Sequence, residues 1–582
     1  MNYSLFKHKK DDDSSVYIRA SVSRAGRKSK VTIEKYDSIR LLDEKYGSWE
    51  KFIKERISVL EQQKHDLRKK ARTITLDYSQ SIDEHGLSFL KNAGYLLLQK
   101  VYYSLGIDQF IYHYKNNRNL KFEYSLNDVM RLLVFSRIIS PASKLRTTQD
   151  AQSYLENFDV TLSDVYDGLT RIADFRGSLQ RYLYDKVRRI LPPSDDVIYY
   201  DVTNFYYEIE DENEVAAYGV EKNHRPDPIT SFGLFMDSNG VPIRYSDYRG
   251  NINESKQILP EWKELREETL NQDNSYIICT DAGLNSANLK YYCITRGDHY
   301  LFSQSVKKLA KDTLEDVFKE DGWVSMGDGR SYKVIKTIKN ASVTDSTSTR
   351  KDGKKNKELD TMYVIFFDPK RRDYILEKIE DRISRAKEII SKPASYDKVS
   401  SCSGKQYIEK LAFDENGCII ESESVLSLRE DLIAKEKKFA GYGGLVTDML
   451  DRKPEELIAI SSRRWEIEDC FRQMKTGFST RPVYLRRPDH IHAHFMTCYV
   501  SLMIMKLLEK KYLRGMSAER IFSLLRTARY HVMDDTGDIV AVEMSEDAVK
   551  AFRKMHLDQF LYTMVSNQTL KGVIRSTKVN DC

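Results

Sequence analysis

Three charged residues in the second half of the chain have the types and spacing that phosphate chemistry needs. Glu468 follows Arg464 by four residues and precedes Lys475 by seven. At about 100° per residue, a helix would place all three within roughly 40° of one another. The acid could then hold a metal ion while the two bases bind phosphates. Arg/Glu pairs at this spacing also occur on many solvent-exposed helices, so the segment alone leaves both interpretations open.

Two aspartates stand in runs of residues that predict strands. Asp201 interrupts the β-branched and aromatic run 197–207, which is typical of a buried strand. A carboxylate there is costly to desolvate unless a cation or a hydrogen-bond network holds it, which favours a metal ligand; an Asp that caps a neighbouring turn is the alternative. Asp281 ends the apolar run 276–281 beside Gly283, where α/β sheets usually place their chemistry.

The elements around these acids predict an α/β fold with a mixed sheet. After the Asp201 strand the pattern predicts a hairpin, a helix, the Asp281 strand, a second helix and another strand. This is the ribonuclease-H-like order, in which Asp201 and Asp281 lie side by side and the Glu468 helix can pack across them. The expected elements are strands 231–236 and 241–248, helix 254–270, helix 286–294 and strand 299–303.

With these residues in this order, the chain resembles the DDE transposases of bacterial insertion sequences, in the long-insert branch of the IS-four superfamily. The signature of that group is Tyr-x2-Arg-x3-Glu-x6-Lys. Arg464, Glu468 and Lys475 match its last three positions, whereas Ser461 stands at the Tyr position and puts the contact of that tyrosine in doubt. Further matching motifs between residues 197 and 505 are Tyr200-Asp201-Val202-Thr203, His224-Arg225-Pro226-Asp227, Gly250-Asn251, Thr280-Asp281-Ala282-Gly283 and Arg481-Pro482-Val483-Tyr484.

The resemblance implies metal-dependent phosphoryl transfer on double-stranded DNA. Asp201, Asp281 and Glu468 would be the catalytic residues and would bind two Mg²⁺ or Mn²⁺ ions about 3.5–4 Å apart. Arg464 and Lys475 would bind DNA phosphates beside the cleaved bond. The enzyme would bind terminal inverted repeats, cut the element ends and join their 3′-hydroxyls to target DNA. It would act as a homodimer in a synaptic complex, in the bacterial cytoplasm at the nucleoid.

Two other functions are compatible with the same residues. A decayed or domesticated copy would bind DNA without catalysis, and a metal-dependent nuclease of the same fold would cut DNA without joining it. The three acids are retained together with Arg464 and Lys475, which favours the active transposase over both.

The composition indicates a soluble multidomain protein. Of its 582 residues, 41% are hydrophobic, and the net charge of +6 is small because 93 basic residues face 87 acidic ones. DNA affinity must therefore come from local basic patches. The 7 cysteines have no paired spacing, which is typical of a reducing cytoplasm. We expect no signal peptide, and the apolar segment 495–508 is too short to span a membrane.

The distance between Asp281 and Glu468 predicts an interrupted core. The two acids are 187 residues apart, too far for one connection, so an inserted mixed α/β domain must leave and re-enter the fold. Within it, the polar segment 340–359 predicts a mobile loop, and 441–448 predicts the returning strand. The expected regions are a small strand/helix region 1–80, a mostly helical DNA-binding region 81–192, the core 193–304, the insertion 305–440, the second core part 441–510 with the Glu468 helix, and a C-terminal helical region 511–582 that could contribute to a dimer.

Several basic segments allow more than one interpretation. Residues 24–30 follow a strand-like run, and 64–70 end a predicted helix over 48–71; both fit either a solvent-exposed face or DNA contact. His490 and His494 have the spacing of a metal site on one helix face, but no Cys or acidic partner has matching local spacing. Packing or hydrogen bonding near the active site is the favoured role for His494.

Overall fold

The described part of the chain forms two compact units. The computed structural model separates residues 1–85 from residues 86–582, and each unit is described by itself. Together they contain the described residues 3–9, 13–24, 27–68, 90–208, 211–219, 227–344, 353–392, 404–413, 419–533 and 536–579.

The N-terminal unit is a three-stranded antiparallel sheet followed by two helices. Val16 and Ile18 from the central strand pack with Ile53 from the second helix as its small core. The two predicted strands and the predicted helix are present, and a further strand precedes them. Ala25 and Gly26 of the basic turn, and the chain beyond residue 68, lie outside the described residues. The elements are β1 (Tyr3–Lys9), β2 (Ser14–Arg24), β3 (Arg27–Tyr36), α1 (Ile39–Tyr46) and α2 (Trp49–Arg68).

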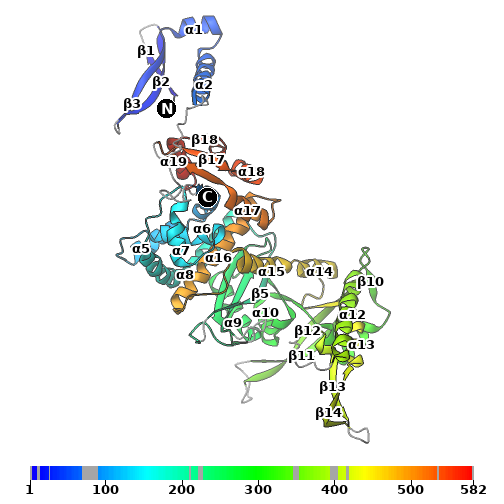
Figure 1. The fold of residues 1–582 in the computed structure, drawn as a ribbon. Coiled ribbons are helices and arrows are strands. Elements are labelled where there is room, and N and C mark those ends of the chain that lie inside the picture. Colours follow the sequence, from blue (N-terminus) through cyan, green and yellow to red (C-terminus); the bar gives the residue numbers. More distant parts are fainter. Residues whose placement is uncertain are drawn as a thin grey trace. The chain divides into compact units, whose positions relative to one another are not determined.

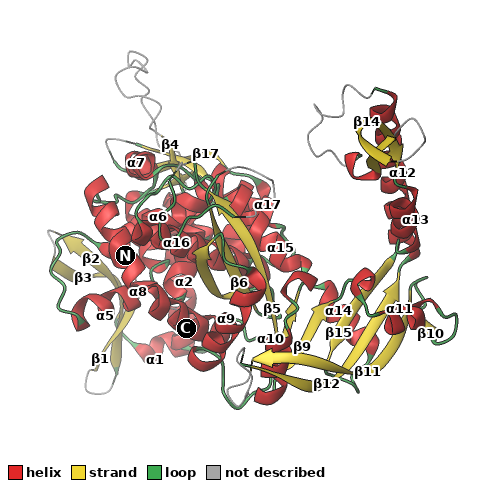
Figure 2. Cartoon of the chain, turned by 90° about the horizontal axis from the view of Figure 1, so that it is seen from below, coloured by secondary structure: helices red, strands yellow, loops and turns green. Residues whose placement is uncertain are grey.

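A nine-stranded mixed sheet organises the second unit (Figures 1 and 2). The strand order is β10-β11-β12-β15-β9-β8-β5-β6-β7, and β5 pairs antiparallel with β6 but parallel with β8. From β5 to β9 the elements follow the predicted order, with α9 (Glu254–Glu268) and α10 (Ala287–Arg296) between the strands. The strands are β5 (Val197–Tyr206), β6 (Ile229–Met236), β7 (Pro242–Arg249), β8 (Ile277–Thr280), β9 (His299–Ser303), β10 (Trp323–Ser325), β11 (Ser331–Thr344), β12 (Lys354–Phe367) and β15 (Tyr442–Thr447).

The two faces of this sheet belong to two hydrophobic cores, because side chains alternate along a strand. Ile198 and Tyr200 of β5 pack into the core that contains Trp262 of α9. Tyr199 and Phe205 face the other core, which the helical region fills. The second unit also contains the helices α4 (Tyr95–Ser104), α5 (Ile107–Asn117), α6 (Leu126–Ile139), α7 (Lys144–Gln149), α8 (Leu162–Ile190), α14 (Pro454–Ser462), α15 (Trp465–Arg472) and α16 (Pro488–Leu507).

Helix α16 is the apolar helix that the sequence predicts to be buried. The segment Pro488–Tyr512 is long and apolar enough to cross a membrane, but 94% of its apolar window is buried inside the protein. It packs against α8, α6 and β7. That burial is typical of a core helix rather than a membrane span.

The predicted insertion 305–440 is not confirmed as a domain apart from the core sheet. Strands β10, β11 and β12 extend that sheet through β15, which returns the chain as expected. Only the following part has its own core, around Ile379 and Ile383 of α12. In Figures 1 and 2 it lies on the side away from α5–α8. Its elements are α12 (Pro369–Ser391), β13 (Ile408–Phe413), β14 (Ile419–Leu428) and α13 (Glu430–Lys438).

Two predictions of local structure are wrong. Residues 340–344 belong to β11 and residues 354–359 belong to β12, and these two segments pair with each other as antiparallel strands. Cross-strand pairs stabilise such a ribbon although most of its side chains are polar. Residues 345–352 lie outside the described residues. The C-terminal region is not purely helical, because three of its strands pair in a sheet with β4 (Leu90–Asn92). Its elements are α17 (Ala518–Thr527), β16 (Arg529–Val532), β17 (Ile539–Glu543), α18 (Glu546–Lys554), β18 (Met564–Val565) and α19 (Asn567–Ser576).

Candidate active site

The parallel pairing of β5 with β8 sets two of the predicted acids side by side in the sheet. Tyr200 is opposite Thr280, and Asp201 and Asp281 are the next residues on each strand. Tyr199 and Cys279, two residues before each acid, face the core that contains α15. Because alternate residues share a face, both aspartates stand on the side of the sheet that α15 covers.

Each aspartate also accepts a hydrogen bond from the backbone at its strand. The Val202 N–H donates to Asp201 Oδ1 at 2.8 Å, and the Ala282 N–H donates to Asp281 Oδ1 at 2.7 Å. Asp281 thereby caps the short 3₁₀ turn Ala282–Leu284. The Asp281 side chain is 54% exposed, so its second oxygen is accessible to a cation.

Helix α15 carries Glu468, and Arg464 is its N-cap residue. The helix packs against β5 and leaves Glu468 exposed, without an ion pair to any residue that the structure describes. Arg464 Nη2 lies 3.3 Å from Asp281 Oδ1, and Arg464 Nη1 donates to Ser303 Oγ at 2.5 Å. The buried residues that anchor the helix include Ile467, Cys470 and Phe471.

The predicted helix over 463–475 is shorter and less regular than expected. Its α-helical part is Trp465–Arg472, and Lys475 lies in the π-helical turn Gln473–Gly477 that follows. A π-turn changes the angle between successive side chains, so Lys475 does not keep the 100° phase that relates Arg464 to Glu468. Lys475 is half-buried there.

A cavity of about 390 Å³ adjoins Asp281 and Arg464. Ser461, at the signature's Tyr position, lines it, as do the basic residues Lys307 and Arg371. The described residues contain no group of three or more His, Cys, Asp or Glu side chains placed to hold a metal ion. The structure therefore joins Asp281 to Arg464 and sets Asp201 on the next strand, but it does not gather the three acids into one cluster.

Residues 232–504 match the family model for the transposase DDE domain. This part of the chain is similar to a transposase DDE domain. The match contains Asp281, Arg464, Glu468 and Lys475, and it begins after Asp201, inside β6. It supports a DDE transposase, a class that depends on divalent metals for DNA cleavage and transfer.

The other comparisons add little to this assignment. No curated protein matches the chain. Among solved structures, the cryo-EM structure of the piggyBac transposase synaptic complex with hairpin DNA matches with 9% sequence identity and a TM-score of 0.35, over 84% of this chain and 83% of that chain. At that score the likeness is too weak to assign the fold.

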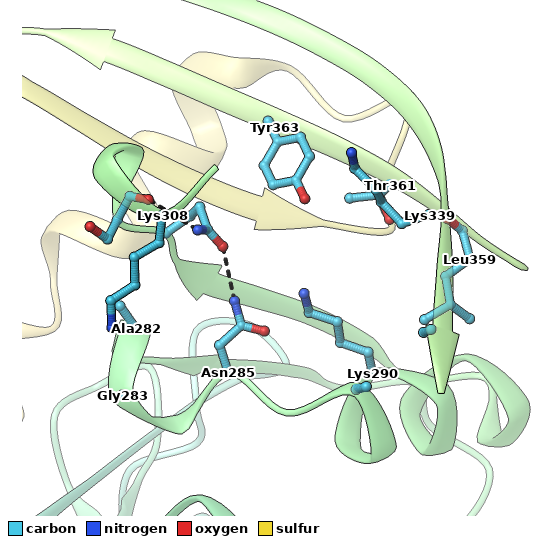
Figure 3. Close-up of a pocket in the computed structure, with 13 residues that line it drawn as sticks. Ala282, Gly283, Asn285, Lys290, Lys308, Lys339, Leu359, Thr361 and Tyr363 are labelled. Atoms are coloured by element: carbon cyan, nitrogen blue, oxygen red, sulfur yellow. Dashed lines mark hydrogen bonds between the residues drawn. The ribbon is translucent and has the colours of Figure 1, made fainter. Parts of the chain in front are cut away.

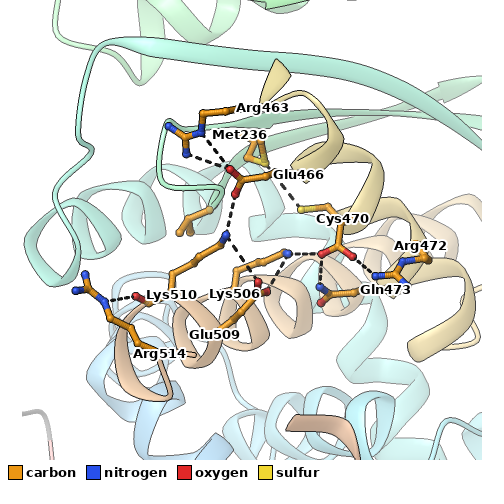
Figure 4. A network of polar contacts seen from close by, with 12 residues as sticks. Met236, Arg463, Glu466, Cys470, Arg472, Gln473, Lys506, Glu509, Lys510 and Arg514 are labelled. Atoms are coloured by element: carbon orange, nitrogen blue, oxygen red, sulfur yellow. Dashed lines mark hydrogen bonds and ion pairs between the residues drawn. The ribbon is translucent and has the colours of Figure 1, made fainter. Parts of the chain in front are cut away.

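Two further acids on α15 fasten the helix to the end of α16 and the π-helical turn Leu508–Tyr512 that follows it. Lys510 Nζ lies 2.8 Å from Glu466 Oε2, and Lys506 Nζ lies 2.7 Å from Asp469 Oδ2. Glu509 contacts both lysines, so the two pairs form one network (Figure 4). The role of these acids could not be recognised from the sequence, because their partners follow about 40 residues later. They set the orientation of α15 and leave Glu468 on its exposed side.

The turn between β6 and β7 holds the start of the same helix. Arg463 donates to the Ser238 carbonyl and to Glu466 Oε1. A Cβ added at Gly240, where φ is +81°, would lie 2.3 Å from Glu466 Oε2. Asp237 begins the turn and accepts the N–H groups of residues 239 and 241. Burial raises the pKa of Asp237 to about 7, although those two hydrogen bonds lower it.

A second cavity, about 500 Å³ in volume, shares Ala282, Gln304 and Ser305 with the cavity beside Asp281; we call it the lysine cavity. Lys290, Lys308 and Lys339 line it, and Figure 3 shows Lys290 and Tyr363 pointing into it from opposite walls. No Asp or Glu is among its lining residues. Burial lowers the pKa of Lys290 to about 8. The cavity therefore offers cationic donors close to the second acid.

Proposed function

We propose that this chain is the transposase of a bacterial insertion sequence, of the IS-four superfamily and its long-insert branch. It binds terminal inverted repeats, cuts DNA at the element ends and joins the 3′-hydroxyls to target DNA. The observation that carries this proposal is the register of β5 and β8, because it sets Asp201 beside Asp281 on the face that the Glu468 helix covers. The DDE-domain match over residues 232–504 supports it.

The proposed core is ribonuclease-H-like. Support comes from the strand order β7-β6-β5-β8-β9, in which β7, β6 and β5 pair antiparallel while β5, β8 and β9 pair parallel. Residues 305–440 would be the family's insertion, although β10–β12 continue the core sheet. The helical region 81–192 and the region 511–582 would contribute end recognition and the contact between two copies.

Asp201, Asp281 and Glu468 suit Mg²⁺ or Mn²⁺, because all three offer hard oxygen ligands and none is Cys or His. Two such ions would supply an activated water or 3′-hydroxyl nucleophile and would neutralise charge on the leaving oxygen. Asp281 is accessible, but it is paired with Arg464, and Glu468 stands alone on its helix face. A cation can reach the second oxygen of Asp281, whereas binding through both oxygens requires Arg464 to release Oδ1.

Arg464 and Lys475 are the proposed phosphate-binding residues at the cleaved bond. Arg464 suits this task because its guanidinium can hold a phosphate in a bidentate fork once it leaves Asp281. The lysine cavity lies directly beyond Ala282 and provides three more cations for the same strand. Local basic groups of this kind compensate for the small net charge of +6.

The test is a cleavage and joining assay on labelled DNA that carries the sequences flanking the gene, in Mg²⁺ or Mn²⁺. Cutting at the repeat tip followed by strand joining should occur with the wild-type protein and be lost in Asp201→Asn, Asp281→Asn and Glu468→Gln. Glu267→Gln, at an exposed position on α9, is the matched control and should retain both steps. Cutting without joining would favour a nuclease, and binding without cutting in either metal would favour an inactive copy.

A further inference from the structure

Three motifs that the DDE chemistry does not use meet at one cavity of about 300 Å³. These are the Ser140–Lys144 break after α6, the Arg481–Tyr484 motif, and His494 of α16. Four nitrogen-bearing side chains among the lining residues define what we call the basic cavity: Arg137, Lys144, Arg481 and His494.

The cations of the basic cavity are buried without acids. Lys144 is 7% exposed and Arg137 is 8% exposed, yet neither forms an ion pair with any residue in the described part of the chain. No Asp or Glu lines the cavity. Arg137 Nη1 donates only to a backbone carbonyl, that of Phe478, at 3.2 Å. An unpaired buried charge is costly: burial, and next the charge of Arg137, lower the pKa of Lys144 to about 7, so a bound anion would favour the protonated form of Lys144.

His494 adds an unused polar atom. Its Nε2 is 3.4 Å from the Thr480 carbonyl, which fits a weak hydrogen bond, while its Nδ1 is buried without a partner in the described residues. Burial, and next the charges of Arg137 and Lys144, hold the pKa of His494 well below its usual value. The ring is therefore neutral at pH 7 and adds no third positive charge to the cavity.

The mouth of the basic cavity carries exposed aromatic rings. Tyr484 is 69% exposed and Tyr166 is 38% exposed, and both line the opening. Exposed tyrosines beside cationic side chains suit a nucleotide, since a base can stack on a ring while its phosphate reaches the charges.

The backbone connects this cavity to the catalytic strand. Val483, in the cavity wall, forms a β-bridge with Tyr207, and its N–H donates to the Tyr206 carbonyl at the end of β5. Tyr207 is six residues beyond Asp201. At about 3.3 Å per residue the separation along the strand is roughly 20 Å, within the length of a few nucleotides of one DNA strand.

We infer that the basic cavity binds a phosphate group of the DNA strand held at the Asp201–Asp281 site, with the adjacent base against Tyr484 or Tyr166. This inference rests on the proposed function for the DNA itself. Arg137 and Lys144 supply the charge, and Arg481 lies at the wall nearer β5. The site would position DNA at a distance from the cleaved bond and take no part in the chemistry.

The experiment compares wild type with Lys144→Met, which keeps the length of the side chain and removes its charge, and with Arg481→Gln in case Lys144→Met does not fold. Lys571→Met, at an exposed position on α19, is the control. The first measurement is the melting temperature in inorganic phosphate against sodium chloride at equal ionic strength. Phosphate should raise the melting temperature of wild type and of Lys571→Met, and should raise that of the cavity variants much less.

The second measurement is DNA binding without divalent metal, across a range of salt concentrations. Each cavity variant should bind about tenfold more weakly, with a salt slope lower by about 1, as expected for one lost phosphate contact. A lost phosphate response with unchanged DNA affinity and slope would mean that the cavity takes a free anion, which overturns the DNA assignment. Equal phosphate responses in all proteins would overturn the site itself. If wild type binds no DNA, the proposed function fails, whereas the phosphate measurement still decides whether the cavity binds an anion.

Discussion

Arg464 forms an ion pair with Asp281: its Nη2 lies 3.3 Å from Asp281 Oδ1, while its Nη1 donates to Ser303 Oγ. The cation at the start of the Glu468 helix thus neutralises the second acid. Asp281 is 54% exposed, which makes this pair weak enough for a divalent ion or a DNA phosphate to replace it. The two partners would then separate, one toward the ion and the other toward DNA.

The first prediction concerns this competition. Arg464→Gln should bind Mn²⁺ about two- to fivefold more tightly than wild type, since an exposed ion pair contributes about 0.2–1 kcal/mol. The same variant should lose DNA cleavage, because the phosphate contact is gone. Isothermal titration with Mn²⁺ and the cleavage assay measure the two effects on the same preparation.

Lys307→Gln is the control for that experiment. Lys307 lines the same cavity and is exposed, so its loss removes one positive charge without releasing Asp281. Weaker Mn²⁺ binding in Arg464→Gln than in Lys307→Gln would contradict a competition between the arginine and the metal.

The second prediction concerns the buried pair that fixes α15. Lys506 is 1% exposed and pairs with Asp469, whose pKa lies below its usual value because Lys506, Arg472 and Gln473 outweigh the effect of burial. Lys506→Met should lower the free energy of unfolding by at most about 3–5 kcal/mol, since it removes the buried cation and leaves the Asp469 carboxylate only the exposed Arg472 as an ion-pair partner. Urea denaturation measures this loss, and the double variant with Asp469→Asn should recover much of it.

The pH dependence of the same pair has a definite sign. A carboxyl with a lowered folded pKa stabilises the protein above its unfolded pKa, and this stabilisation is lost as the pH falls through the folded pKa. Asp469→Asn should therefore be less stable than wild type at pH 7, and the difference should shrink below about pH 4. A constant difference from pH 7 to pH 3 would show that the charge of Asp469 does not matter.

The strands that hold Asp201 and Asp281 could be predicted because their signals are local. Each strand is an apolar run bounded by polar turns, and the turn Asp237–Gly240 marks the hairpin. Asp201 was recognisable because an acid within such a run is rare. The order of these elements then fixes which strands are neighbours.

What the sequence could not predict depends on distant partners. Residues 354–359 are polar and look like a loop, but residues 339–344 of β11 pair with them. Strand β16 pairs with β4, which lies more than 400 residues earlier. Glu466 resembles its neighbour Glu468 in sequence, and only the position of Lys510 separates their roles.

The third prediction concerns Asp237 in the turn that holds Arg463. Burial raises its pKa to about 7, so the folded protein binds a proton there that the unfolded chain releases near pH 4. Between those values, stability falls as the pH rises, by at most about 1.4 kcal/mol per unit. Asp237→Asn should lack this dependence and become the more stable protein toward pH 7. Urea denaturation at pH 5, 6 and 7 tests it, and parallel curves for the two proteins would refute it.

The fourth prediction concerns Lys290 of the lysine cavity. Burial lowers its pKa to about 8, and its Nζ lies 5.4 Å from the centre of the Tyr300 ring. Lys290→Met should bind DNA more weakly, with a salt slope lower by about 1, because one phosphate contact is lost. It should also melt at a higher temperature than wild type at pH 7, because a buried positive charge without an acidic partner is removed.

The two effects of Lys290→Met separate binding from folding. Between pH 8 and pH 10.5 the unfolded wild-type chain keeps the proton that the folded protein releases, so wild-type stability rises with pH and the advantage of Met shrinks. Lys308→Met is the matched variant, since Lys308 lines the same cavity but is exposed. It should lose DNA affinity without a gain in melting temperature. If the melting temperature of Lys290→Met at pH 7 is lower than that of wild type, Lys290 stabilises the folded protein by contacts within it, and the proposed phosphate-binding role of Lys290 is contradicted.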